Sequence, residues 1–278
     1  MTSWQDLHRQ TRERVGDPVA RWLCEEASGS VDVLESAPGE TASPSMIAHL
    51  DRMAERYVAG EPLAYVLGHW SFRHLDLAVD RRVLIPRPET EVVAGVAIEL
   101  ASTLPRPLTL ADLGTGSGAI GLALADELPL DGVTVWLTDV DDDAIDVARA
   151  NLAGLGRRGR NVRIAAGSWF DALPGGTTLE LVVSNPPYIA DDSTDVEPAV
   201  REWEPPAALF AGRDGLGALR VIVDEAPQWV RTGGWVVLEI GADQGPDVTG
   251  LFVAAGYRSV EIRPDLAGRD RVAIAQVP

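Results

Sequence analysis

Apolar residues recur at helical spacing in the first 60 residues of the chain. Asp17-Pro18 and Ser43-Pro44 each supply a capping side chain followed by a proline suited to the first helical position. After the second signal, apolar residues continue at intervals of three or four positions until Gly60, a residue type that commonly ends helices. This pattern predicts a small helical bundle, whose apolar residues are interpreted as a core rather than a binding groove.

After residue 70 the apolar residues alternate with polar ones, which predicts a short hairpin or an extended connector over about 70–79. A proline-rich loop follows, and we expect Thr90 to cap the next helix. The expected parts are a helical domain for substrate recognition at 1–68, a hairpin and linker at 69–89, and a main domain at 90–278.

From residue 108 onward, short apolar runs alternate with amphipathic stretches. The candidate strands are 108–113, 133–138, 161–165, 180–184, 235–240, 258–263 and 271–276. Helices are expected near 118–128, 141–153, 216–230 and 246–254. Alternation at this spacing predicts an α/β fold with a doubly wound, mostly parallel, seven-stranded sheet. Only a short turn separates the last two strands, so they should pair antiparallel.

A run of β-prone residues at 181–184 ends abruptly at Asn185, Pro186, Pro187 and Tyr188. Proline has no N–H for a sheet ladder, so the carbonyls of Asn185 and Pro186 are candidates for pairing outside the sheet. With the Asn185 amide and the Tyr188 ring they make a slot for a planar group bearing an NH₂. Asn-Pro alone is more often an ordinary strand-ending turn, so this interpretation depends on the rest of the chain.

A glycine-rich segment, DLGTGSGA, runs from Asp112 to Ala119 and closes the first of these strands. Its glycines allow a ligand to approach the backbone and lead into a helix N-terminus with partial positive charge. Asp139 ends the second strand, where a carboxylate can accept hydrogen bonds from both hydroxyls of a ribose. The segment also fits the G-x-G-x-x-A pattern of nicotinamide-binding proteins, and a structural glycine turn is a third interpretation. The slot at the end of the fourth strand favours a methyltransferase acting on a planar nitrogen, because a dehydrogenase has no need of it.

Composition narrows the possible partners. The 42 acidic residues outnumber the 24 basic ones, all of which are arginine, and the net charge of −18 disfavours nucleic acid as the main partner. A single cysteine, Cys24, excludes an intrachain disulfide and a cysteine metal cluster, and we expect no metal. No apolar run reaches the roughly 18 residues of a membrane helix, and the N-terminus is polar, so we expect a cytoplasmic protein without membrane contact.

Six segments together resemble the release factor glutamine methyltransferases, the protein-(glutamine-N5) methyltransferase family. They are GEPLAYVLG (60–68), IPRPETE (85–91), DLGTGSGAI (112–120), SNPPYI (184–189), DGL (214–216) and EIG (239–241). The glycine and Asn-Pro-Pro-Tyr motifs are shared with amino methyltransferases of DNA or RNA bases, which remain the alternative function. The first two segments are more particular to the glutamine enzymes.

The resemblance implies a Rossmann-like class I methyltransferase fold and S-adenosyl-L-methionine as the methyl donor. By position, the methionine end would lie on the glycine-rich segment: Gly114, Thr115, Gly116, Ser117 and Gly118. Asp139 would bind the ribose, Trp169 the adenine face, and Asn185 would also contact the cofactor. Many relatives carry an acid where this chain has Ser168, which predicts an altered cofactor affinity rather than lost function.

The resemblance also implies an acceptor, the glutamine of the Gly-Gly-Gln motif in class I peptide chain release factors. Asn185, Pro186, Pro187 and Tyr188 would hold its amide, with Asn185, Pro186 and Tyr188 as the catalytic residues. The expected partner is thus a protein of the translation termination machinery, with no direct nucleic acid contact.

Overall fold

The chain forms two units in a computed structural model that describes residues 2–194 and 196–278. The first unit takes in the described residues up to His69 and the separate segment Glu197–Trp203. The second takes in the other described residues, from Trp70 to the end of the chain. The first unit is therefore assembled from two stretches that lie far apart in the sequence.

The first unit is helical. Its helices are α1 (Trp4–Val15), α2 (Asp17–Ser28), α3 (Val33–Ser36), α4 (Pro44–Val58), α5 (Leu63–Leu67) and α9 (Pro198–Trp203). Leu23, Leu50 and Met53 are buried in the core that α1, α2 and α4 enclose. The predicted start of α4 is confirmed, because the Ser43 side chain accepts a hydrogen bond from the backbone N–H of Met46.

The predicted cap at Asp17 is wrong. Gly16, with φ of 84°, both ends α1 and precedes α2, so Asp17 is already the first residue of the helix. The Asp17 carboxylate lies 3.5 Å from the Arg12 guanidinium and 3.7 Å from His8 Nε2. Glycine adopts a left-handed backbone conformation without steric cost, so the chain turns from α1 into α2 at Gly16 without a side-chain cap.

The second unit contains the predicted seven-stranded sheet, in the order β5-β4-β3-β6-β7-β9-β8. Its strands are β3 (Leu108–Leu113), β4 (Val133–Asp139), β5 (Val162–Ala166), β6 (Leu179–Ser184), β7 (Val230–Glu239), β8 (Arg258–Pro264) and β9 (Asp270–Gln276). The first five in spatial order are parallel, and β9 is antiparallel to β8, as predicted. Strand β9 is also antiparallel to β7. A hairpin of β1 (His69–Phe72) and β2 (Leu75–Ala78) forms a separate two-stranded sheet.

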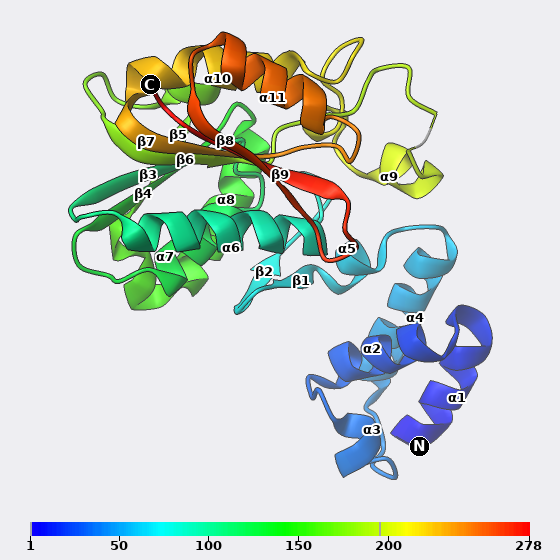
Figure 1. Cartoon of the computed structure of the whole chain (residues 1–278). Helices are drawn as coiled ribbons and strands as arrows, with labels where there is room; N and C mark the ends of the chain where they lie inside the picture. The colour runs from blue at the N-terminus through cyan, green and yellow to red at the C-terminus, as the bar shows by residue number, and fades with distance from the viewer. Residues whose placement is uncertain (1, 195) are drawn as a thin grey trace. The chain divides into compact units, whose positions relative to one another are not determined.

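Helices cover both faces of the large sheet (Figure 1). One layer holds α6 (Pro88–Thr103), α7 (Ala119–Glu127) and α8 (Asp142–Gly154), and the other holds α10 (Gly217–Trp229) and α11 (Gly245–Ala254). The described residues of this unit also form three short 3-10 helices: η1 (Gly156–Asn161), η2 (Trp169–Ala172) and η3 (Pro206–Ala208). Along β6, Leu181 and Val183 enter the core under the first layer, and Val182 enters the core under the second. Such a strand, buried on both faces, is a nearly continuous apolar run.

Thr90 does not cap α6, contrary to the prediction. The cap position belongs to Arg87, and Pro88 occupies the first helical position, where its fixed φ suits the helix. Thr90 therefore lies inside the first turn, is 4% exposed, and turns its hydroxyl away from the helix.

Within residues 2–194 and 196–278, no helix combines the length and apolar character needed to cross a membrane. The same residues contain no group of three or more His, Cys, Asp or Glu side chains arranged to hold a metal ion.

Candidate active site

The loops that follow β3 and β6 meet at one edge of the sheet. The two strands are parallel neighbours, and the hydroxyl of Ser184 donates a 2.6 Å hydrogen bond to the carbonyl of Leu113. The chain crosses from β3 to β4 on one side and places β6 on the other, so a topological switch point lies between them. Ligands of open α/β sheets bind at such points, beyond the carboxyl ends of the strands.

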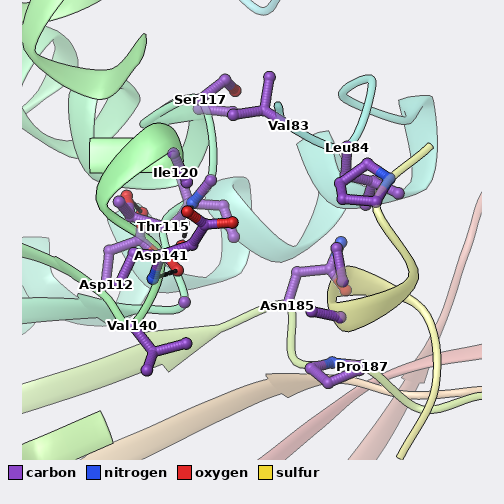
Figure 2. Close-up of a pocket in the computed structure, with 18 of the residues that line it drawn as sticks. Val83, Leu84, Asp112, Thr115, Ser117, Ile120, Val140, Asp141, Asn185 and Pro187 are labelled. Carbon is purple, nitrogen blue, oxygen red and sulfur yellow. Dashed lines mark hydrogen bonds between the residues drawn. The ribbon is translucent and has the colours of Figure 1, made fainter. Parts of the chain in front are cut away.

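A cavity of about 190 Å³ lies at this edge. Figure 2 shows Asn185 and Pro187 on one side of it and Asp112, Thr115 and Asp141 on the other. Nine of the residues predicted from the sequence line it, Ser168 included: Gly114, Thr115, Gly116, Ser117, Asp139, Ser168, Trp169, Asn185 and Pro187. Gly118, Pro186 and Tyr188 are not among the lining residues. The tertiary structure thus joins the two predicted motifs in one cavity.

The glycine-rich loop is shaped by left-handed backbone conformations. Gly114 has φ of 67°, and a Cβ there would lie 3.4 Å from the indole ring of Trp169. Gly118, with φ of 88°, precedes α7, where a Cβ would lie 2.9 Å from the Leu122 side chain. The absence of a side chain at Gly114 lets the backbone lie close to the Trp169 indole, and its absence at Gly118 lets the Leu122 side chain pack against the loop.

Two carboxylates border the glycine loop. Asp112 is 1% exposed, and its Oδ2 accepts hydrogen bonds from the Thr115 hydroxyl (2.5 Å) and the Gly121 N–H (2.8 Å). Its Oδ1 is buried without a hydrogen-bond partner among the described residues. Burial raises the pKa of the Asp112 carboxyl group to about 6. A buried acceptor of this kind beside a cavity suits a ligand that brings a hydrogen-bond donor or positive charge.

Asp139 is tied to the loop backbone. Its Oδ2 accepts from the N–H of Gly116 at 2.9 Å, and its Oδ1 accepts from the N–H of Asp141 at 3.1 Å. Burial raises the pKa of Asp139, and these N–H groups act in the opposite direction. The carboxylate is fixed at the end of β4 and keeps acceptor capacity for a further donor.

Trp169 is half-buried and has φ of 45°, an uncommon value for a residue with a side chain. Its ring contacts the core under α10 and α11 on one side and borders the cavity at Gly114 on the other. Ser168, just before it, is exposed and also lines the cavity. The pair therefore offers a flat apolar surface beside a hydroxyl, which suits a planar heterocycle.

The Asn-Pro-Pro-Tyr loop is held from behind by Gln244. The Gln244 Nε2 donates to the carbonyl of Tyr188 at 3.0 Å, while its Oε1 accepts from the N–H of Gly241 at 2.8 Å. Gly215 approaches the same carbonyl so closely that a Cβ would lie 2.4 Å from the Tyr188 oxygen. Its φ of 70° adds to the requirement for glycine, which explains the DGL segment physically.

Inside the loop, Pro186 is buried, and no hydrogen bond among the described residues uses its carbonyl oxygen. Asn185 is half-buried, and its Nδ2 donates to the Thr90 hydroxyl at 3.2 Å. The Tyr188 hydroxyl donates to Glu239 at 3.2 Å. The amide oxygen of Asn185 and the Pro186 carbonyl are the acceptors left for a ligand.

Sequence reasoning gave no site role to Thr90, Glu239 or Arg271. Glu239 ends β7, is 1% exposed, and accepts from Thr90 at 2.7 Å. Burial raises the pKa of Glu239 to about 7, while the Thr90 hydroxyl and the Arg271 charge act to lower it. The sequence signal that was available for Glu239 is an acidic residue near the end of the apolar predicted strand 235–240.

A second buried acid fixes the loop before α6. The Glu204 carboxylate accepts from the N–H of Ile85 at 3.2 Å and also contacts the Arg87 guanidinium. Glu204 is 3% exposed and Arg87 is half-buried, so the ion pair anchors the proline-rich loop to a buried carboxylate. Pro86 on that loop and Pro205 beside Glu204 both line the cavity.

Comparison with known proteins identifies close relatives. Residues 93–202 match the family model "Methyltransferase small domain". The chain is 38% identical to the release factor glutamine methyltransferase of Vibrio cholerae, with 91% of this chain and 87% of that protein covered. It is 39% identical to the same enzyme of Neisseria gonorrhoeae, with 86% and 85% covered.

Solved structures agree on the architecture. A methyltransferase from Pyrococcus furiosus superposes with a TM-score of 0.54 at 20% identity, over 81% of this chain and 98% of that one. The catalytic domain of hMettl16 superposes with a TM-score of 0.60 at 17% identity, over 91% and 90%. At these identities the likeness concerns the fold alone, which is that of the class I methyltransferases.

Proposed function

The chain belongs to the release factor glutamine methyltransferase family, and we propose that it transfers a methyl group from S-adenosyl-L-methionine to a release factor. The acceptor is the side-chain nitrogen N5 of the glutamine in the Gly-Gly-Gln motif of class I peptide chain release factors. The observation that carries the proposal is the continuity of one cavity from the glycine loop and Asp139 to Asn185. A donor and an amide acceptor can meet in such a space.

The residues around the cavity fit this donor. The buried, unpartnered Oδ1 of Asp112 suits the donor's cationic end, and the fixed Asp139 carboxylate suits its ribose hydroxyls. The flat surface of Trp169 suits its adenine, with the Ser168 hydroxyl beside it. When bound, the donor supplies an electrophilic methyl group on a sulfonium.

Orientation rather than deprotonation activates the acceptor in this proposal. An amide nitrogen has a delocalised lone pair and a pKa far beyond any side-chain base. The Asn185 Oδ1 and the Pro186 carbonyl accept its two N–H groups, which turns the lone pair toward the methyl group. Positioning of this kind contributes up to about 7–11 kcal/mol in favourable systems. The same oxygens stabilise positive charge as it develops on nitrogen, and the extra proton then leaves to water.

Two further parts of the proposal concern the partner. We assign the helical unit of α1 to α5 to recognition of the release factor, because the donor and amide residues all belong to the other unit. We also place the reaction in the cytoplasm, where release factors terminate translation.

Mass spectrometry tests the proposed function directly. The enzyme is incubated with donor and a purified class I release factor, and peptide mapping is expected to find one added methyl on the Gly-Gly-Gln glutamine. A Gln→Asn release factor should react poorly, because its amide is withdrawn by about 1.5 Å and displacements of that order cost about a hundredfold. Preferential methylation of nucleic acid in a competition assay would instead support a base methyltransferase and contradict the proposal.

A further inference from the structure

We propose that Thr90 and Glu239 are positioning residues, which hold the Asn185 side chain with its amide oxygen toward the substrate; this inference rests on the function proposed above. Neither residue needs to contact the reacting atoms. Both act through the hydrogen bond that Asn185 makes to Thr90, at 3.2 Å.

Asn185, Thr90 and Glu239 form a chain of hydrogen bonds. The chemistry of their donors and acceptors fixes the direction in which each proton is given. Above a pH of about 7 the Glu239 carboxylate is ionised and can only accept, so the Thr90 hydroxyl gives its one proton to Glu239 Oε2, at 2.7 Å. The Thr90 oxygen can then only accept from Asn185. The half of the Asn185 amide that faces Thr90 must therefore be the NH₂ group, and the oxygen must face the other way.

On the other oxygen of Glu239, the hydrogen bonds also run toward the carboxylate. Arg271 can only donate, and its Nη1 lies 3.4 Å from the Tyr188 hydroxyl oxygen. The Tyr188 hydroxyl consequently directs its proton to Glu239 Oε1, at 3.2 Å. Arg271 Nη1 is itself fixed by a 2.9 Å bond to the carbonyl of Ile240. Glu239 is thus the common acceptor of two donors, one from α6 and one from the loop after β6.

Burial makes the arrangement selective. Thr90 is 4% exposed and Glu239 is 1% exposed, so water cannot easily replace either partner. If the Asn185 amide were rotated by half a turn, its oxygen would face a Thr90 oxygen with no proton to give. Its NH₂ would then face the N–H groups of the acceptor amide, and the slot would lose one of its two acceptors.

The test compares three substitutions of Thr90 in the full-length enzyme. Thr90→Val keeps shape and removes the hydroxyl, Thr90→Ala removes it with less volume, and Thr90→Ser keeps it. Thr138→Val is the matched control, because Thr138 is 0% exposed and its hydroxyl has no hydrogen-bond partner among the described residues. The measurements, made at pH 8 where Glu239 is ionised, are kcat with a class I release factor, donor Kd by calorimetry, and thermal unfolding.

We expect Thr90→Val and Thr90→Ala to lower kcat about tenfold or more while donor Kd stays within about twofold. Thr90→Ser should retain kcat within about threefold, and Thr138→Val should match the parent. A folded Thr90→Val or Thr90→Ala enzyme with parental kcat would overturn the inference, as would an equal loss in Thr138→Val. A parent enzyme that adds no methyl to the release factor would instead contradict the proposed function, and the inference with it.

Discussion

The hydroxyl of Ser184, at the end of β6, donates a 2.6 Å hydrogen bond to the carbonyl of Leu113, at the end of β3. Both residues are fully buried, so this bond ties the two strands at the point from which the glycine loop and the Asn-Pro-Pro-Tyr loop diverge. It thus adds to the backbone pairing of β3 and β6, which sets the relative position of the two halves of the site.

Ser184→Ala should lower the free energy of unfolding by about 1–3 kcal/mol, because it leaves a buried carbonyl without its donor. Urea unfolding of the parent and the variant measures the change. Ser102→Ala serves as control, since that exposed serine only bonds back to its own helix, and its change should stay below about 0.5 kcal/mol. Equal stability of the two variants would contradict the role of Ser184.

Asp139→Ala should weaken binding of S-adenosyl-L-methionine by about 1.5–3 kcal/mol, since a charged hydrogen-bond acceptor is lost. The Gly116 N–H also loses its partner, which loosens the loop further. Calorimetry gives the affinity, and Asp142→Ala, at an exposed position of α8, should bind the donor like the parent. Unchanged affinity in Asp139→Ala would exclude it as a cofactor residue.

Asn185→Ala should bind donor nearly as well as the parent but turn over far more slowly, by about a hundredfold, because the acceptor amide loses one of its two anchors. Steady-state kinetics with a release factor, paired with donor calorimetry, separates the two effects. Asn161→Ala, which removes an amide bonded to the Leu130 carbonyl outside the cavity, should keep parental turnover. Turnover within a few-fold of the parent in Asn185→Ala would refute the amide slot.

Gly215→Ala should lose both stability and activity, because its Cβ would lie 2.4 Å from the Tyr188 carbonyl and displace the slot. Gly212→Ala isolates this effect. Gly212 also has a left-handed φ, of 81°, but a Cβ there meets nothing within 4 Å. The midpoint temperature of thermal unfolding and kcat are both expected to fall much further for Gly215→Ala than for Gly212→Ala. Similar decreases in the two variants would mean that backbone strain alone matters.

Glu239 should make stability depend on pH. Its pKa is raised from the ordinary 4.5 to about 7, so the folded state holds the proton more tightly than the unfolded state. Its contribution to stability is complete below pH about 4.5 and is lost as pH rises through about 7. The charged neighbours are Arg271, which favours ionisation, and Glu89, which opposes it.

Urea unfolding at pH 5 and pH 8 measures this dependence. The parent should lose stability between the two values by more than Glu239→Gln does, because glutamine does not titrate. The difference between the two proteins removes the effect of the overall charge of −18, which both nearly share. An identical pH dependence would show that Glu239 does not titrate in this range.

The order of the elements could be predicted from the sequence, because each one depends on periodicity within a short window. The predicted strands and helices after residue 108 fall within a few residues of their observed positions, except that β7 begins at Val230 rather than 235. Helix α9 was not predicted, and the antiparallel final pair follows from its short turn. Ser43 was identified as a cap because capping joins residues three positions apart. Nine of the predicted site residues, Ser168 among them, line one cavity because both motifs end neighbouring parallel strands.

What only the tertiary structure decided is which distant groups complete the site. Thr90 lies 95 residues from Asn185 and 149 residues from Glu239, so no local pattern relates them. The sequence therefore predicted a helix cap at Thr90, and the fold placed it in a buried hydrogen-bond chain instead. The same holds for Glu197–Trp203, which groups with the N-terminal helices. Local chemistry determines where an element starts and ends, but burial and the pairing of polar groups across the sheet depend on how the whole chain packs.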